Sequence, residues 1–133
     1  MNQEELSARL RAMFVEELAD QLGEANRHLL ALERNPANGD ELRSLFRVMH
    51  TLKGAARSAN VLEIERVCHR LESMLAAARD AGRALTRAEL DALFAGVDQL
   101  IADGTALGGA TMPTREISPD SVAAESESTE GET

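Results

Sequence analysis

The sequence contains few aromatic residues and a single cysteine. Its 133 residues include three Phe, no Trp and no Tyr. A hydrophobic core must therefore be built from Leu, Ala, Val, Ile and Met, most of which favour helices. Few segments are rich in the β-branched and aromatic residues typical of strands. Because Cys68 is the only cysteine, an intrachain disulfide is excluded.

Long apolar runs and an excess of positive charge are also missing. No apolar stretch approaches the length of a membrane span. The N-terminal run MNQEELSARL contains acidic residues where a signal peptide would have an apolar core. The net charge of −9 gives no basic footprint for nucleic acid. We therefore expect a cytoplasmic protein that neither inserts into a membrane nor binds nucleic acid.

The acidic charge is concentrated near the C-terminal end. Residues 105–133 contain six acidic residues and one arginine among many Gly, Ser, Thr and Pro residues. This composition has no sustained apolar period and is typical of disorder. We predict a folded domain over residues 1–104 and a flexible acidic linker or tail over residues 105–133. Only residues 117–124 could form a short fifth helix, and such a tail suggests that the chain was cut from a longer protein.

Four segments have the periodicity of amphipathic helices. Their apolar residues recur at steps of three and four, which places them on one face of a helix. The expected helices cover residues 3–33, 40–59, 62–81 and 87–104. Short connections between four such helices predict an all-α, antiparallel up-down-up-down bundle.

Polar and small residues indicate where these helices begin and end. Asp40 is expected to cap the start of the second helix, and Asn60 suits the turn after it. Thr86 and Glu89 have the spacing of a capping box. Gly104 is expected to end the fourth helix.

The second helix carries a basic stripe with a histidine at its centre. Arg43, Arg47, His50, Lys53 and Arg57 recur at steps of four, three, three and four, with no acid among them. Most charged stripes are solvated faces without further function. In this stripe, however, repulsion between like charges on one helix face has a small energetic cost. A bound anion would relieve that repulsion.

The third helix offers a carboxylate and a second histidine to this stripe. His69 and Glu72 are three residues apart and therefore share a face. In an antiparallel pair that turns near Asn60, both lie opposite His50. A carboxylate that accepts the Nδ1 proton fixes the tautomer and leaves the Nε2 lone pair as a nucleophile. We expect Glu72 to orient His50 in this way from a partly exposed position, and Lys53 to neutralise the oxygens of an incoming anion.

Gly54 indicates a surface where another protein approaches. Glycine within a helix costs about 0.5–1 kcal/mol relative to alanine, so its position four residues after His50 calls for a reason. The absence of a side chain there would let a partner reach the imidazole.

Two motifs resemble those of histidine-containing phosphotransfer (HPt) domains. FRVMHTLKGAAR, residues 46–57, closely resembles the phosphorylation motif H-x-[IL]-K-G-x-[AG], and CHRLE, residues 68–72, resembles the H-x-x-E segment of the following helix. The spacing of the two histidines is similar to that in the N-terminal domain of CheA-type chemotaxis kinases. The resemblance covers about residues 10–103. It implies that His50 is phosphorylated, that Lys53 and His69 line the site, that Glu72 supports the reactivity of His50, and that Gly54 is the small neighbouring residue.

The resemblance also implies partners. A histidine kinase ATP-binding domain would phosphorylate His50, and a CheY-like or CheB-like receiver domain of a response regulator would accept the phosphoryl group on an aspartate. The domain itself would need no cofactor or metal, while the kinase would use ATP and Mg²⁺ and the receiver Mg²⁺. Because the sequence has no glycine-rich phosphate loop or aspartate motif for Mg²⁺, we expect the substrate and carrier portion of a CheA-type kinase, without a complete catalytic site. The receiver is expected to dock on Arg47, Gly54, Ala55 and Arg57.

Two alternatives involve no phosphoryl transfer. His50, His69 and Glu72 could bind a metal in a helical bundle, although carboxylates are few and Lys53 would repel a cation. The bundle could instead be a purely docking module in which His50 is incidental, although the Lys53-Gly54 pair disfavours this. Only phosphotransfer predicts an acid-labile, base-stable modification by a kinase with ATP.

Overall fold

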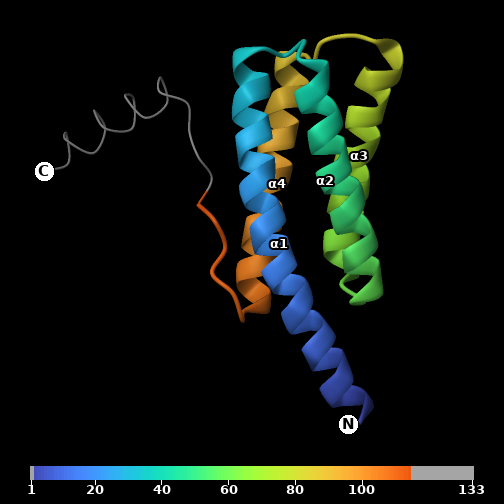
Figure 1. The fold of residues 1–133 in the computed structure, drawn as a ribbon, viewed down its shortest axis with the longest axis vertical. Coiled ribbons are helices and arrows are strands. Elements are labelled where there is room, and N and C mark those ends of the chain that lie inside the picture. Colours follow the sequence, from blue (N-terminus) through green and yellow to red (C-terminus); the bar gives the residue numbers. More distant parts are fainter. Residues whose placement is uncertain (1, 115–133) are drawn as a thin grey trace, which may run out of the picture.

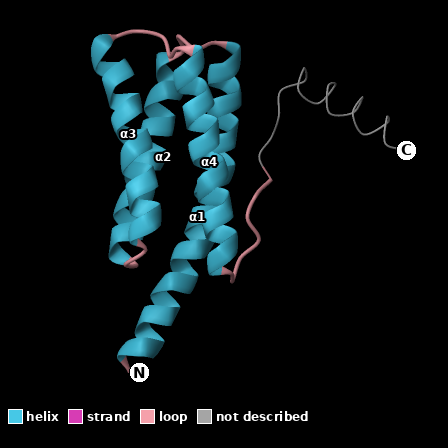
Figure 2. Cartoon of the chain, turned by 180° about the vertical axis from the view of Figure 1, so that it is seen from behind, coloured by secondary structure: helices cyan, strands magenta, loops and turns pink. Residues whose placement is uncertain are grey.

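The computed structural model describes residues 2–114 and confirms the predicted helical bundle. Its helices are α1 (Gln3–Arg34), α2 (Gly39–Ser58), α3 (Leu62–Ala81) and α4 (Arg87–Leu107). The part of the chain that the structure describes contains no strand, and Figure 2 shows helices joined by short loops. Across residues 2–114, no helix combines the length and the apolar character needed to cross a membrane.

Successive helices run antiparallel and surround a core of aliphatic side chains (Figure 1). Both α1 and α3 pack against α2 and α4, so α1 and α3 occupy opposite corners of the bundle. Phe14 and Phe94 are the buried aromatic residues within this core. Leucines dominate the rest of it, as the shortage of aromatic residues requires. The fully buried leucines are Leu18, Leu22, Leu29, Leu32, Leu45, Leu52, Leu71, Leu75, Leu90, Leu93 and Leu100.

The turn between α2 and α3 fixes how these two helices face each other. Asn60 adopts the left-handed conformation with φ 59°. Its N–H donates to the Arg57 carbonyl at 3.1 Å, and the Val61 N–H donates to the Ala56 carbonyl at 2.9 Å. These two bonds form a Schellman motif, in which asparagine replaces the more usual glycine. The turn residue predicted at Asn60 is therefore confirmed.

Three helix ends test the predicted boundaries. The Thr86–Glu89 capping box is present as predicted. The cap of α2 is Asn38, whose side chain accepts from the Glu41 N–H at 3.2 Å, so the prediction of Asp40 was wrong by two residues. The predicted end of α4 at Gly104 was also wrong, because the helix continues to Leu107.

Gly104 is explained by close packing instead of by helix termination. A Cβ at this position would lie 2.6 Å from Met112 Sδ and 2.9 Å from Leu18 Cδ2. Met112 belongs to a segment that follows α4 and packs on the core, and the carbonyl of Thr114 accepts from Asn26 Nδ2 at 3.3 Å. The domain boundary predicted after Gly104 thus falls inside α4. The predicted flexible tail beyond residue 114 and the short fifth helix at 117–124 lie outside the described residues.

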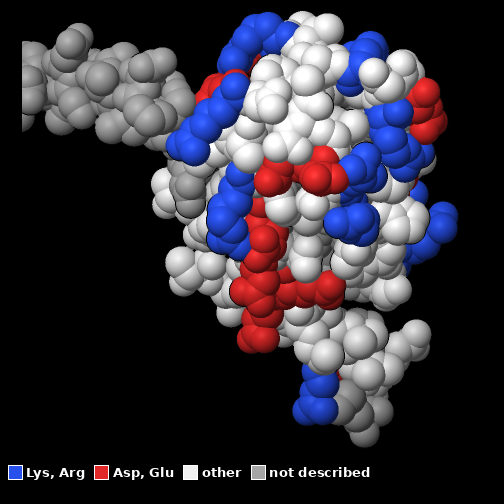
Figure 3. Space-filling view, turned by 45° about the horizontal axis from the view of Figure 1, so that its top comes forward, with Lys and Arg blue, Asp and Glu red and all other residues white. Residues whose placement is uncertain are grey.

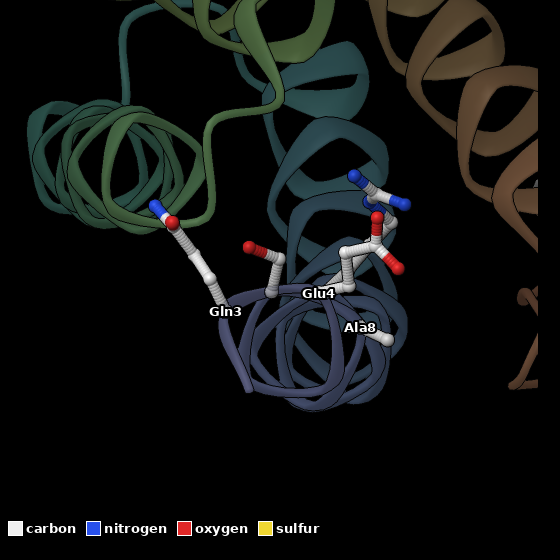
Figure 4. A pocket seen from close by; sticks show the side chains of 5 residues that line it. Gln3, Glu4 and Ala8 are labelled. Atoms are coloured by element: carbon white, nitrogen blue, oxygen red, sulfur yellow. The ribbon is translucent and has the colours of Figure 1, made fainter. Parts of the chain in front are cut away.

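The first turns of α1 extend beyond the end of the bundle (Figure 1). Leu6 and Leu10, which continue the apolar stripe of the sequence, are consequently exposed, as is Met13. Figure 4 shows a shallow hollow on these turns, around Gln3, Glu4 and Ala8. None of its lining residues was predicted to take part in the chemistry of His50.

Candidate functional site

The four residues predicted to form the site meet on the seam between α2 and α3. His50 and Lys53 come from α2, and His69 and Glu72 come from α3. The antiparallel turn at Asn60 brings them together, since His50 and Glu72 are separated by similar lengths of helix from it. The His50 side chain is 65% exposed, whereas that of Glu72 is 11% exposed. An accessible imidazole therefore lies over an almost buried carboxylate.

Both oxygens of the Glu72 carboxylate are engaged by α2. Oε2 is hydrogen-bonded to Nδ1 of His50. Lys53 Nζ donates to Oε1 at 2.7 Å. Burial raises the pKa of Glu72, but the hydrogen bonds from Lys53 and His50, together with their charges, outweigh it and hold the pKa below the usual carboxyl value. Glu72 is thus ionised at neutral pH.

The ionised state of Glu72 determines the tautomer of His50. A carboxylate can only accept hydrogen bonds, so Nδ1 of His50 must carry the proton that it shares with Oε2. In the neutral imidazole, Nε2 then keeps its lone pair. In that form, the exposed ring directs the Nε2 lone pair away from Glu72, which is what a nucleophile requires.

The burial of Glu72 corrects the expectation that it would be partly exposed. Glu72 follows the fully buried Leu71 along α3, and it lies at the inner edge of the seam. Its charge also acts on Cys68 one turn earlier. Burial in the first place, and the charge of Glu72 in the second, raise the pKa of the Cys68 thiol to about 12, so this cysteine is a core residue and not a nucleophile.

The three histidines of the chain differ in the exposure of the ring and in the contact that Nδ1 makes with a carboxylate. His28 Nδ1 contacts Glu41 Oε2 at 2.5 Å, but its side chain is only 22% exposed. His69 is 65% exposed, but its Nδ1 lies 3.9 Å from Glu72 Oε1, beyond hydrogen-bond distance. Only His50 has both an accessible ring and a hydrogen-bonded carboxylate at Nδ1.

The residues predicted to contact a partner lie on α2, before and after His50. Gly54 is exposed, and a Cβ added to it would meet no atom within 4 Å. Ala55 is half-buried and packs partly on the core. Arg47 donates to the Ser44 hydroxyl at 3.3 Å, and Arg57 forms an ion pair with Glu65 at 3.1 Å.

Positive charge extends from α2 onto α3. Figure 3 shows Lys and Arg side chains on both sides of the molecule, with Asp and Glu side chains between them. The exposed arginines of these two helices are Arg43, Arg47, Arg57, Arg66, Arg70 and Arg79. Four of these arginines form ion pairs with acidic residues of the same helices, whereas no ion pair is found for Arg47 and Arg70 within residues 2–114.

Two residues next to the site, Phe46 and Arg79, were not predicted from the sequence. The rings of Phe46 and His50 are stacked, with their centroids 6.1 Å apart and an interplanar angle of 11°. The guanidinium carbon of Arg79 lies 4.5 Å from the centroid of the Phe46 ring. The spacing of four residues between Phe46 and His50 could have predicted the first contact. No sequence signal indicates the second.

The metal-binding alternative lacks a suitable ligand cluster in the described residues. Across residues 2–114, no group of three or more His, Cys, Asp or Glu side chains is arranged to hold a metal ion. Lys53, whose ammonium group lies on the Glu72 carboxylate, would in addition oppose a cation at this position.

Comparison with known proteins identifies what the chain is similar to. The Hpt domain family matches residues 9–103. The chemotaxis protein CheA of Bacillus subtilis is 33% identical over 88 residues, which are 66% of this chain and 13% of that protein. CheA of Listeria monocytogenes is 32% identical over 82 residues, 62% of this chain and 13% of that protein. The chain thus spans only about an eighth of the length of these relatives.

A solved structure shows the same fold. The CheA phosphotransferase domain from Thermotoga maritima superposes with a TM-score of 0.71 at 34% sequence identity. The match covers 75% of this chain and 95% of that domain.

Proposed function

Since the chain belongs to the Hpt domain family, a family of phosphotransfer domains, we propose that His50 is the residue that carries its phosphoryl group. One observation supports this choice above the others. His50 is the only histidine of the chain that combines an accessible ring with a carboxylate on Nδ1.

The proposed chemistry uses Nε2 of His50 as the nucleophile. Its lone pair forms a bond to the γ-phosphorus of ATP while the bond from this phosphorus to the bridging oxygen breaks, and ADP leaves with that electron pair. The imidazole becomes cationic and keeps its Nδ1 proton. Glu72, which accepts this proton in a hydrogen bond, favours the positive charge that develops on the ring.

In the second step the phosphoryl group leaves for a partner. A carboxylate oxygen of an aspartate bonds to phosphorus as the bond from phosphorus to Nε2 breaks, and the electron pair returns to the imidazole. Lys53 lies one turn from His50 and can move from Glu72 toward the phosphoryl oxygens. Its ammonium would supply charge in both steps, beside His69 at the exposed edge of the site.

We propose two partners for these steps, both separate from residues 2–114. The ATP-binding domain of a CheA-type histidine kinase would phosphorylate His50 with ATP and Mg²⁺, and a CheY-like or CheB-like receiver domain would accept the phosphoryl group with its own Mg²⁺. A receiver site that holds Mg²⁺ through carboxylates is acidic, so the arginines of α2 and α3 would steer its approach. Gly54 would leave room for close contact.

Phosphorylation of histidine variants tests this proposal. The 133-residue chain is incubated with a CheA-type kinase core and radiolabelled ATP, and acid and base treatment identify the modification. His50→Gln should take up no label, while the matched variants His28→Gln and His69→Gln should still be labelled. Wild-type labelling of His50→Gln would refute the proposal, and so would the absence of acid-labile label on the wild-type chain with every active CheA-type kinase tried.

A further inference from the structure

The ring of Phe46 lies nearly parallel to the imidazole of His50. Phe46 lies one helical turn before His50 on α2, and the two rings are within 11° of parallel at a centroid separation of 6.1 Å. This separation is in the range of offset-stacked aromatic pairs. Phe46 is half-buried and packs against the core with its remaining surface.

The Phe46 ring is in turn held from the neighbouring helix. Arg79, in the last turn of α3, places its guanidinium 4.5 Å from the ring centroid, a cation–π distance. The same guanidinium donates from Nε to Asp80 at 3.0 Å, which limits its movement. Imidazole, phenyl ring and guanidinium therefore form one chain of contacts that crosses the α2–α3 seam.

The hydrogen bond to Glu72 does not fix the tilt of the His50 ring. It restrains a single atom, Nδ1, about which a ring that is 65% exposed can still tilt. A tilt moves the Nε2 lone pair away from the line of attack on phosphorus. A parallel ring against one face removes this freedom because it defines the plane of the imidazole.

We infer that Phe46, held by Arg79, is a positioning residue that sets the ring plane of His50, so that Glu72 fixes the tautomer and Phe46 fixes the direction of Nε2. This inference rests on the proposed function of His50. A single hydrogen bond from Glu72 can fix the tautomer of His50, but it cannot also fix the plane of the ring. A loss of direction should slow the chemical step without weakening the binding of the kinase.

Substitutions that keep or remove the flat ring test this inference on the full 133-residue chain. Phe46→Leu keeps an apolar side chain but loses the stacking face, and Phe46→Tyr keeps the face as a matched control. Arg79→Gln removes the cation at an exposed position, with Arg79→Lys as its control. Each variant is compared for kcat and KM with a CheA-type kinase core, for the rate with the small donor phosphoramidate, and for the NMR order parameter of the His50 Cδ2–H bond.

For Phe46→Leu we expect kcat to fall roughly 3- to 10-fold, as the loss of an aromatic pair would give. KM should stay within about twofold, the phosphoramidate rate should fall in parallel, and the order parameter of the His50 ring should drop. Phe46→Tyr and Arg79→Lys should keep wild-type values, and Arg79→Gln should show a smaller fall of the same kind.

Two results would overturn the inference. One is a Phe46→Leu variant with wild-type kcat and ring order. The other is a lower kcat accompanied by an unchanged order parameter, which would assign Phe46 to general stability. If His50→Gln were labelled like the wild type, the proposed function would fail, but the order parameters would still decide whether Phe46 sets the ring plane.

Discussion

Gly96 of α4 lies directly against Leu71 of α3. A Cβ added to Gly96 would lie 2.6 Å from Leu71 Cδ2 and 2.7 Å from Leu71 Cδ1. Leu71 is fully buried and immediately precedes Glu72 in sequence. Because Gly96 has no side chain, α3 can approach α4 closely at Leu71, next to Glu72.

Alanine at Gly96 should therefore destabilise the bundle. We expect Gly96→Ala to lower the free energy of unfolding by about 1–3 kcal/mol, as overpacking of a full core does. Gly54→Ala is the matched control, because its added methyl group would meet no atom within 4 Å. It should stabilise the protein by about 0.5–1 kcal/mol through helix propensity. Urea denaturation measures both, and equal effects of the two substitutions would contradict the close approach.

Loss of the Glu72 charge should reduce phosphorylation more than binding. A hydrogen bond to a charged group contributes about 1.5–3 kcal/mol, so its loss from the transition state corresponds to a rate decrease of roughly 10- to 100-fold. Glu72→Gln keeps the shape of the buried side chain while it removes the charge. Single-turnover phosphorylation by a CheA-type kinase core, and a separate binding measurement, would distinguish the two effects.

Glu41→Gln is the control for this experiment. Glu41 contacts His28 with the same atoms that Glu72 uses on His50, but it lies on a less exposed histidine. It should leave the phosphorylation rate unchanged. An equal loss of kinase binding and of rate in Glu72→Gln would mean that Glu72 is a docking residue.

Glu89 should make the stability of the domain sensitive to acid. The hydrogen bond from Arg83, followed by that from the Thr86 backbone, lowers the pKa of Glu89 from 4.5 to about 2. Because the pKa is lower in the folded state, this contribution to stability is fully present above about pH 4.5 and is lost as the pH falls toward 2. Arg83→Gln should give a shallower decline of the urea midpoint over this interval. Parallel curves for the two proteins would show that Arg83 does not set this pKa.

A long side chain at Gly54 should block transfer from His50 to a receiver. At Gly54 an added Cβ would meet no atom within 4 Å, so Gly54→Gln should leave the packing of the domain intact. We expect unchanged helical circular dichroism and a strongly reduced rate of transfer from the phosphorylated domain. Gly23→Gln, at a less exposed position on α1 where an added Cβ would likewise meet no atom within 4 Å, should transfer normally. Normal transfer by Gly54→Gln would place the receiver on another surface.

The sequence was sufficient to predict the helical bundle and the proximity of His50 to Glu72. Apolar periodicity determined the helices, and Asn60 marked a turn about midway between the two residues, so their proximity followed from antiparallel geometry. The burial of Glu72 could not be predicted in this way, because the residue lies at the border of the apolar stripe, where a small rotation of α3 decides its exposure.

Two other features depend on side-chain packing that periodicity does not contain. A glycine near the end of a helical pattern usually indicates termination. Gly104 instead accommodates Leu18 and Met112, and Met112 comes from a segment without helical periodicity. The contact of Arg79 with Phe46 joins two helices through the rotamer of a long side chain. Such contacts follow from the assembled structure and not from residue spacing.

The antiparallel pair α2–α3 holds every residue proposed to act on the phosphoryl group. His50 and Glu72 are only 22 positions apart in the chain, and the turn at Asn60 closes the loop between them. Loop-closure entropy is modest at this separation, and local contacts of this kind favour rapid folding. We expect the hairpin to acquire its arrangement early, with α1 and α4 docking afterwards. Substitutions in α1 and α4, apart from contacts such as that of Gly96 with Leu71, should then change the lifetime of the folded domain more than its chemistry.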